Sequence, residues 1–550
     1  MLLSADLGVA GAINPAAISP DTSLTAREEE IIAAAAPATA PQFHSPQIIG
    51  IHPGTPFLLC LAVTGERPLR FSAKHLPEGL SLDPRTGIIT GTLKDRGDYG
   101  FTALAQNSAG TAKTKIKIAC GDTLALTPPM GWNSYDAFGD SVVESEVLSN
   151  ALWLKENLQP AGWDTVVVDF RWYDRLASGT RPQGNAEGVT IDKFGRCIPA
   201  LNRFPSAADG KGFKQLAEEI HALGLKFGIH IMRGIPRKAV EQNLAIAGSD
   251  YTAGQAALPQ GDANRASIWN NDMYGVNGTT AAGKAWYESI AKQYAAWGVD
   301  YVKCDDIANM FRGRFYSADE VAALSRALND SGRSIILSLS PGPAPVDQAA
   351  HLEQFANLWR ISGDFWDKWQ SLDHNFDLFA QWYQQGQPGH WPDGDMIPFG
   401  HICQRNCDVH PDRWTRFTRD EQLTLMSLWA LAPSPLMLGA NLPDNDVWTA
   451  AILSNPEVLA VNQDALGQQG HRRGYTSSGA EIWTKKLSTG ALAVGFFNRT
   501  EKPLTIDYPW RNLSFSKPHV RDLWIGQDTG RQREFRAELP PHGCVLLWVR

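Results

Sequence analysis

The sequence predicts a multidomain α/β protein in which a central (β/α)8 barrel, the TIM-barrel fold, lies between two β domains. Three observations support this fold class. The chain has 550 residues, which exceeds one ordinary domain of roughly 100–200 residues. Segments in its middle repeat a helix end, a glycine and a buried apolar run. The segments on both sides carry short β-like runs separated by turn residues instead.

Composition narrows the class of partner. With 43% hydrophobic and 20% charged residues, the chain is expected to be globular with a large core. A net charge of -8 disfavours nucleic acid as the main partner. No apolar stretch approaches the roughly 20 residues of a membrane helix, so no membrane span is expected. The 19 Trp, 12 Tyr and 22 Phe fit either a large core or flat sugar-binding surfaces, and composition does not separate the two.

Residues 1–42 are predicted to be a tail or linker, partly helical, because they are rich in alanine and proline and contain the acidic run Glu28 to Glu30. The first residues show no signal peptide, since Asp6 stands where an apolar core is needed. Residues 43–120 change to short β runs, which predict a small β-sandwich. The odd number of cysteines leaves at least one without a partner in the chain, and the sequence leaves open a disulfide between Cys60 and Cys120 or between Cys403 and Cys407.

The stretch LPEGLSLDPRTGIITGTLKDRGDYGFTALAQNSAGT resembles the immunoglobulin-like modules of bacterial secreted proteins. This resemblance implies a secreted or periplasmic protein of a bacterium. The module exposes no cluster of aromatic residues in its sequence, so we expect it to act as a spacer or to dock on the barrel.

The barrel is predicted over residues 121–465. Its repeating units are ENLQPAGWDTVVVDF, EEIHALGLKFGIHI, YAAWGVDYVKCDD and LNDSGRSIILSLS. The glycine suits the left-handed residue that closes a helix, and the uniformly apolar run is typical of a parallel strand covered on both faces. A doubly wound nucleotide-binding sheet is disfavoured because no G-x-G-x-x-G or Walker motif follows a strand. Ser317 and Glu320 predict a capping box at one helix start.

Residues 466–550 are predicted to form a C-terminal antiparallel β-sandwich. EIWTKKL and ALAVGFF flank the triplet Ser488-Thr489-Gly490, which is typical of a hairpin turn.

Catalytic groups of such barrels come from the C-terminal ends of the strands, and here these ends are acidic. Two chemistries fit: glycoside hydrolysis by a pair of carboxylates, or hydrolysis assisted by a divalent metal. The metal alternative would use His230, Asp305, Asp306 and Asp395, but the chain lacks an H-x-H or H-E-x-x-H pair. We therefore expect no metal and no cofactor.

Seven segments, in this order, resemble the successive blocks of glycoside hydrolase family 27, which contains retaining α-galactosidases and α-N-acetylgalactosaminidases. They are PPMGWNSYDAFG, AGWDTVVVDF, YVKCDD, WRISGD, WPDGDM, LWALAPSPLMLGANL and ILSNPEVLAVNQDALG. The resemblance extends from about Leu126 to the C-terminus. It implies a retaining, exo-acting glycoside hydrolase, α-galactosidase-like, that needs no metal and acts on an oligosaccharide or polysaccharide. It does not indicate an oligomeric state.

The resemblance assigns the nucleophile to Asp305 and the acid/base to Asp364. A retaining enzyme needs two carboxyl groups about 5–5.5 Å apart, and two strands of one barrel mouth can supply them. Lys303, two residues before Asp305, is expected to keep the nucleophile ionised. Desolvation by Trp359 or Trp366 is expected to raise the pKa of Asp364.

The sugar-binding positions match the family only in part. Asp169, Lys303, Arg360 and Asp395 would hold the sugar. Four other predicted binding positions depart from the pattern. Phe170 stands where the family has the second aspartate of an Asp-Asp pair, Tyr135 stands where it has a tryptophan, and His230 stands where it has a tyrosine. Ser340 stands where α-galactosidases have a glutamate, and the N-acetylgalactosaminidases also have a serine there.

These departures leave the sugar open. A β-L-arabinopyranoside is an alternative, because it has the ring stereochemistry of galactose without the C6 group and Phe170 could fill the vacant space. An α-N-acetylgalactosaminide is another. Phe170 could instead turn into the barrel wall and leave Arg171 or Trp172 in the pocket, since adjacent strand residues face opposite sides. An alternative of another class, a non-catalytic carbohydrate-binding barrel protein, is disfavoured because both catalytic carboxylates are present.

Overall fold

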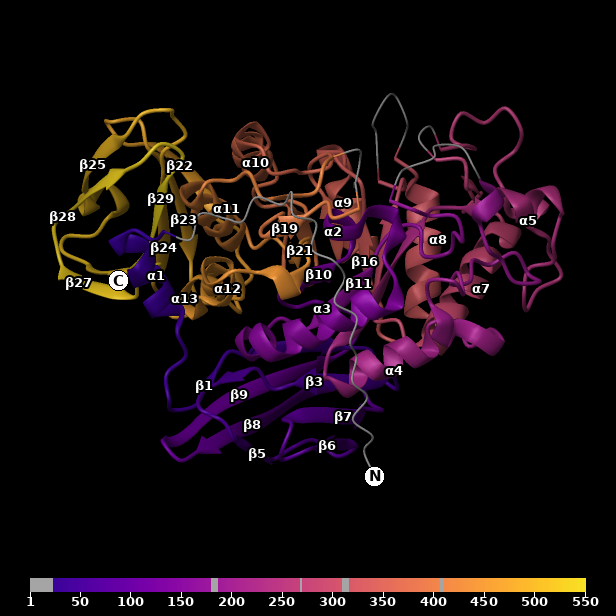
Figure 1. Ribbon diagram of the computed structural model, residues 1–550, viewed down its shortest axis with the longest axis horizontal. Coiled ribbons are helices and arrows are strands. Elements are labelled where there is room, and N and C mark those ends of the chain that lie inside the picture. Colours follow the sequence, from indigo (N-terminus) through magenta and orange to yellow (C-terminus); the bar gives the residue numbers. More distant parts are fainter. Residues whose placement is uncertain (1–22, 180–185, 268–269, 309–315, 406–409) are drawn as a thin grey trace.

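The computed structural model describes residues 23–179, 186–267, 270–308, 316–405 and 410–550. At its centre, parallel strands are paired in the order β18-β17-β16-β15-β12-β11-β10-β21. A bridge between Ile397 and Leu438 joins the two ends of this sheet, so the sheet closes into the predicted (β/α)8 barrel (Figure 1). The barrel strands are β10 (Met130–Asn133), β11 (Thr165–Val168), β12 (Lys226–Met232), β15 (Tyr301–Asp305), β16 (Ile336–Leu339), β17 (Leu358–Arg360), β18 (Trp391–Asp393) and β21 (Leu436–Leu438).

Helices cover the outside of the barrel. Between a helix and the barrel strand that follows it, a glycine adopts a left-handed conformation in four of the repeats. Gly162, Gly224, Gly298 and Gly332 have φ of 110°, 78°, 84° and 86°, a region that glycine adopts at little cost. The four repeats predicted from sequence are therefore confirmed. The main helices are α3 (Glu144–Asn157), α4 (Lys214–Ala222), α7 (Ala281–Trp297), α8 (Ala318–Asn329), α9 (Ala349–Phe355), α10 (Trp369–Gln381), α11 (Arg419–Leu431), α12 (Val447–Ser454) and α13 (Pro456–Asn462).

The tryptophans mostly build the core. Since most of them are almost fully buried, their number reflects packing more than sugar binding. These buried side chains are Trp132, Trp163, Trp172, Trp286, Trp359, Trp382, Trp391, Trp429, Trp483, Trp510 and Trp524.

The capping box predicted for α8 is wrong. Ser317 precedes the helix but makes no side-chain cap, and its Oγ accepts a hydrogen bond from Arg233 Nη1 at 2.7 Å. Glu320 is buried, and its Oε1 accepts from Tyr287 Oη at 2.6 Å and Val276 N at 3.0 Å. Both side chains thus bind residues distant in sequence instead of the start of their own helix.

The N-terminal module is a β-sandwich. One sheet has the order β2-β9-β8-β5 and the other β3-β7-β6. Cys60 and Cys120 are free thiols, so no disulfide joins them. Cys403 is disulfide-bonded, and Cys407 lies outside the described residues. The strands are β1 (Gln42–Phe43), β2 (Ile48–Ile51), β3 (Pro56–Cys60), β4 (Val63–Thr64), β5 (Arg70–Lys74), β6 (Leu80–Leu82), β7 (Ile88–Thr92), β8 (Gly97–Asn107) and β9 (Gly110–Cys120).

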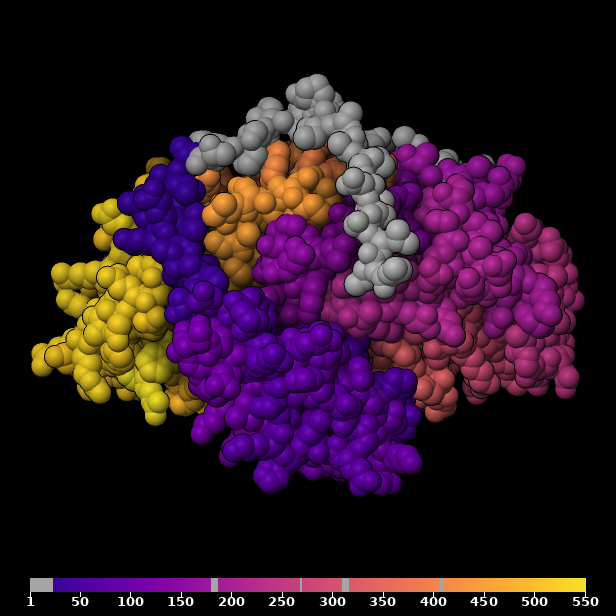
Figure 2. Space-filling view, turned by 60° about the horizontal axis from the view of Figure 1, so that its bottom comes forward, coloured from indigo at the N-terminus to yellow at the C-terminus, as the bar shows by residue number. Residues whose placement is uncertain are grey.

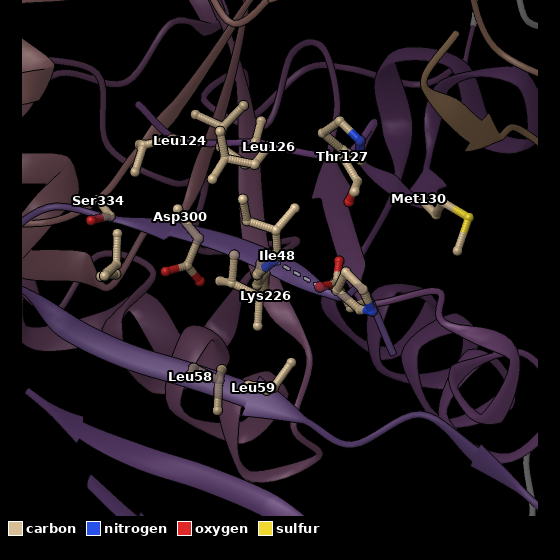
Figure 3. Close-up of a pocket in the computed structure, with 18 of the residues that line it drawn as sticks. Ile48, Leu58, Leu59, Leu124, Leu126, Thr127, Met130, Lys226, Asp300 and Ser334 are labelled. Atoms are coloured by element: carbon tan, nitrogen blue, oxygen red, sulfur yellow. Dashed lines mark hydrogen bonds and ion pairs between the residues drawn. The ribbon is translucent and has the colours of Figure 1, made fainter. Parts of the chain in front are cut away.

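This module packs against the end of the barrel where the strands begin (Figures 1 and 2). His52 N donates to Ser334 Oγ at 2.9 Å, and Gln159 Nε2 donates to Cys60 O at 3.4 Å. An apolar cleft between the two parts is lined by β2, β3 and the connection 124–130, with Lys226 at its barrel side (Figure 3). The module therefore docks on the barrel at the end opposite the predicted active site.

The last part of the chain forms the expected antiparallel domain, with a six-stranded sheet and a separate strand pair. The helix α1 (Ala26–Ala35) lies where this domain meets the barrel. Its Ile31 is fully buried, Arg27 Nη2 donates to Cys544 O in β29 at 3.1 Å, and Glu28 Oε2 lies 2.7 Å from Arg419 Nη1 in α11. Among the described residues, no helix is both long and apolar enough to cross a membrane. The strands are β22 (His471–Tyr475), β23 (Glu481–Lys486), β24 (Leu492–Phe497), β25 (Leu504–Pro509), β26 (His519–Asp522), β27 (Gln527–Arg531), β28 (Glu534–Leu539) and β29 (Cys544–Val549).

Candidate active site

A pocket opens where the barrel strands end, as expected for this fold. Its empty volume is about 430 Å³ including the open mouth, which is in the range of small-ligand sites. Eight of the ten predicted site residues line it; His230 and Ser340 lie behind the wall. The lining residues are Tyr135, Asp136, Asp169, Phe170, Lys303, Asp305, Arg360, Asp364, Phe365, Trp366, Asp395 and Met396.

Asp305 is the last residue of β15 and is held ionised by its neighbours. His230, on the adjacent strand β12, is fully buried, and its Nε2 lies 3.0 Å from Asp305 Oδ2. Burial alone would raise the pKa of Asp305, but His230, and then Lys303, hold this pKa well below its usual range. The sequence predicted that Lys303 keeps Asp305 ionised. In the structure His230, which lies behind the carboxylate, lowers the pKa of Asp305 more than Lys303 does.

Lys303 forms its ion pair with Asp169. The Nζ–Oδ2 distance is 2.9 Å, and Asn133 Nδ2 donates to the same oxygen at 2.5 Å. Despite burial, Lys303 and then His230 lower the pKa of Asp169. A buried carboxylate kept ionised in this way is a strong acceptor for a hydroxyl group.

Asp364 lies at the mouth of the pocket. Its side chain is 59% exposed, and its Oδ1 is 3.4 Å from Arg360 Nη2. Trp366 lines the same pocket, but Trp359 is fully buried and packs on Trp382, with ring centroids 5.7 Å apart. The expected desolvation by Trp359 is therefore wrong, because that ring faces the core.

The pocket holds two further acids, Asp395, which pairs with Arg360, and Asp136. Arg360 Nη2 lies 2.6 Å from Asp395 Oδ2, and Phe365 N donates to the same oxygen at 2.7 Å. Burial raises the pKa of Asp395 to about 7, although Arg360 opposes the shift. Burial also raises the pKa of Asp136 well above its usual value. Asp136 was not among the predicted site residues, although its position just after β10 was a visible signal.

Phe170 lies in the wall of the pocket beside Asp169. Its ring meets the His230 ring edge-on, with centroids 5.4 Å apart. The alternative that Arg171 or Trp172 lines the pocket is wrong. Arg171 points to Asp272, and Trp172 packs among buried aromatic rings.

The remaining predicted residues have supporting positions. Ser340 is buried and accepts from Arg360 Nη1 at 3.4 Å. Asp306 is also buried and is 3.9 Å from Arg233 Nε. Within the described ranges, no group of three or more His, Cys, Asp or Glu side chains is arranged to hold a metal ion.

Comparison with known proteins matches all three parts of the chain. Residues 265–464 match the family model described as "Alpha galactosidase A". Residues 477–549 match "Alpha galactosidase C-terminal beta sandwich domain", and residues 36–120 match "Putative Ig domain".

Individual relatives agree with these matches. An α-galactosidase of Oryza sativa is 28% identical over 81% of this chain and 90% of its own length. A Dictyostelium discoideum protein named "Probable alpha-galactosidase" is 30% identical over 78% of this chain and 94% of its own length. The crystal structure of a family 27 β-L-arabinopyranosidase from Geobacillus stearothermophilus is 44% identical, with a TM-score of 0.73, over 77% of this chain and 96% of its own. The chain belongs to glycoside hydrolase family 27, the α-galactosidase family of retaining glycoside hydrolases.

Proposed function

We propose that this enzyme removes terminal β-L-arabinopyranosyl residues, with Asp305 as nucleophile and Asp364 as acid/base. One observation carries the choice of sugar: Phe170 lies in the pocket wall directly beside Asp169. At this position an α-galactosidase of the family is expected to have a second carboxylate.

The two carboxyl groups have the environments that their roles need. Asp305 is ionised, and its partly exposed side chain lines the pocket, so it attacks the anomeric carbon and forms the glycosyl-enzyme intermediate. Asp364 lies at the mouth, where the departing group leaves, so it protonates the glycosidic oxygen and then activates water for the second step. The bound sugar itself would cover Asp364, because a catalytic contact often tightens only in the substrate complex.

The remaining polar groups would hold the sugar ring. Asp169 would accept hydrogen bonds from ring hydroxyl groups, while Lys303 and Arg360 would donate. Phe170 offers no acceptor to a C6 hydroxyl and places its ring where a hydroxymethyl group would lie. A pyranose without C6 avoids both the clash and the unpaired hydroxyl.

The relative from Geobacillus, named a β-L-arabinopyranosidase, supports this proposal because it is 44% identical. An α-galactosidase is the second candidate, since the curated relatives at 28–30% identity carry that name. Ser340 gives little support to an α-N-acetylgalactosaminidase, because it is buried against Arg360 and Asp305 and does not line the pocket.

The test is a comparison of kcat/KM on nitrophenyl β-L-arabinopyranoside, α-galactoside and α-N-acetylgalactosaminide. We expect the first to be preferred. Phe170→Asp should shift the ratio of kcat/KM toward the α-galactoside roughly tenfold or more, because the hydroxymethyl group gains a charged acceptor worth about 1.5–3 kcal/mol.

Phe170→Leu is the matched control, since it opens the space without adding an acceptor and should shift the ratio less. A wild-type preference for the α-galactoside, or a ratio unchanged in Phe170→Asp while the melting temperature falls, would contradict the proposed specificity.

We also propose that the protein is exported, as the immunoglobulin-like module indicates. Fractionation of the natural host would find the enzyme in the periplasm or the medium. Recovery in the cytoplasm alone would refute export.

A further inference from the structure

Behind Phe170 lies a buried ion pair that the catalytic proposal does not use. Arg171, the next residue, is 3% exposed. Its Nε donates to Asp272 Oδ2 at 2.8 Å, and its Nη2 donates to Asp272 Oδ1 at 2.5 Å. Its Nη1 lies 3.0 Å from Asp174 Oδ2. Two parallel hydrogen bonds to one carboxylate fix a guanidinium in both position and plane.

Asp272 is itself held rigidly. Its side chain is fully buried, and its Oδ2 also accepts from Tyr173 Oη at 3.0 Å and from Asn270 Nδ2 at 3.2 Å. Its backbone carbonyl accepts from Arg237 N at 2.8 Å. The carboxylate therefore has little freedom to move, and neither has the guanidinium that it binds.

Asp272 comes from outside the barrel sheet. It precedes β14 (Met273–Tyr274), in the long connection between β12 and α7 that also holds β13 (Ile235–Pro236), α5 (Arg237–Glu241) and α6 (Ala253–Ala256). Asp272 does not line the catalytic pocket. Any influence on the sugar is therefore indirect, and Arg171 is the partner of Asp272 that adjoins the pocket-lining Phe170.

The path from Arg171 to the reacting centre is short. The Phe170 ring has the Arg171 guanidinium 5.6 Å from its centroid and the His230 ring 5.4 Å away. His230 in turn contacts Asp305. The Phe170 ring is thus flanked by a pinned cation and by the histidine that supports the nucleophile. If Arg171 lost its carboxylate, the buried cation would move toward other acceptors, and the adjoining Phe170 would move with it.

We propose that Asp272 is a positioning residue for sugar selection: it pins Arg171 and thereby holds the Phe170 ring in the space that a C6 hydroxymethyl group would need. This inference rests on the proposed role of Phe170 in excluding that group. It adds that the connection between β12 and α7, and not the barrel alone, determines which sugar fits.

The test is Asp272→Asn, which keeps the shape of the side chain but removes its charge. The ratio of kcat/KM for the β-L-arabinopyranoside over the α-galactoside should fall about threefold to tenfold, a size of coupling usual within one ion-pair network. The matched control is Glu481→Gln in the C-terminal domain. It replaces by a neutral amide a fully buried carboxylate that accepts a hydrogen bond from Arg499 Nη1 at 2.7 Å. The control should lower the melting temperature and leave the ratio unchanged.

A double-mutant cycle separates positioning from general destabilisation. In a Phe170→Leu background, Asp272→Asn should no longer change the ratio, because the ring through which it acts is gone. An equal change in both backgrounds, or an unchanged ratio in the single variant, would overturn the inference. If Phe170→Leu itself leaves the ratio unchanged, the proposed function fails instead.

If Asp272→Asn does not fold, Asp272→Glu decides the question. It keeps the charge but displaces Arg171 by the length of one methylene group. A lowered ratio supports the inference, and a wild-type ratio overturns it.

Discussion

The two ends of the barrel carry similar ion pairs in different surroundings. Where the strands end, Lys303 Nζ lies 2.9 Å from Asp169 Oδ2, and the side chains are 14% and 1% exposed. Where the strands begin, Lys226 Nζ lies 2.7 Å from Asp164 Oδ2, with exposures of 33% and 31%. Asp164 and Asp169 lie at opposite ends of β11, so one strand serves both pairs.

What differs is the ratio of acidic to basic side chains around each pair. At the end facing the immunoglobulin-like module, Asp300 is matched by Arg333 at 2.5 Å and His221 at 2.7 Å. At the catalytic end, the acids Asp136, Asp169, Asp305, Asp364 and Asp395 outnumber the cations Lys303 and Arg360 in the pocket wall. At the end facing the immunoglobulin-like module the acidic side chains are paired with cations, which suits packing, whereas the catalytic end retains carboxylates for chemistry.

The largest expected effect is on the nucleophile. Asp305→Ala should lower kcat by at least about a thousandfold, since the covalent step is lost. Substrate binding should largely remain, and azide should restore some turnover with product of inverted configuration. Steady-state kinetics and product stereochemistry check this, and more than a few per cent of wild-type activity would exclude Asp305 as nucleophile.

A smaller, selective effect is expected for Asp364→Ala. Aryl glycosides with poor leaving groups should lose about 10²–10⁴-fold in rate, whereas those with good leaving groups should lose much less, because only the former need protonation. Equal losses along a series of leaving groups would show that another residue supplies the proton.

Matched substitutions test the comparison of the two ends directly. Lys303→Met leaves Asp169 buried without its cation and should cost about 3–5 kcal/mol of stability together with most activity. Lys226→Met breaks a pair whose side chains are 33% and 31% exposed, so it should cost at most about 1 kcal/mol and leave kcat/KM unchanged. Melting temperatures and steady-state kinetics of both variants check this. Similar losses of stability and activity in the two variants would contradict the comparison.

The last prediction concerns the pH dependence of stability, whose sign differs between the two ends. Between its usual value of 3.8 and about 7, Asp395 holds a proton in the folded state that the unfolded chain has released. Its contribution to stability therefore falls as pH rises through that window, by up to about 1.4 kcal/mol per pH unit.

The contribution of Asp300 to stability changes with pH in the opposite direction. Against burial, His221 and Arg333 lower its pKa below 3.8, so its stabilisation is present above that value and is lost as pH falls further. Thermal unfolding from pH 3 to 8 should show that Asp395→Asn removes the decline between about pH 4 and 7, and that Asp300→Asn removes the acid loss. Parallel curves for wild type and both variants would contradict these signs.

Much of the fold followed from local patterns. The apolar runs and the helix-closing glycines, such as Gly298, predicted the barrel because hydrophobic periodicity and a left-handed residue are local requirements. Local patterns also misled. The Ser317–Glu320 pair has the spacing of a capping box, but distant partners such as Arg233 and Tyr287 bind those side chains instead.

The sequence by itself determined the three-part architecture, the family and the strand ends at which Asp305 and Asp364 stand, because these depend on residue order and on periodicity along the chain. Only the tertiary structure decided that Phe170 faces the pocket while Arg171 turns to Asp272. It also placed His230 behind Asp305 and Trp359 in the core. Asp272 is 101 residues from Arg171, and which of two adjacent side chains enters a pocket depends on partners that meet only after the chain has folded.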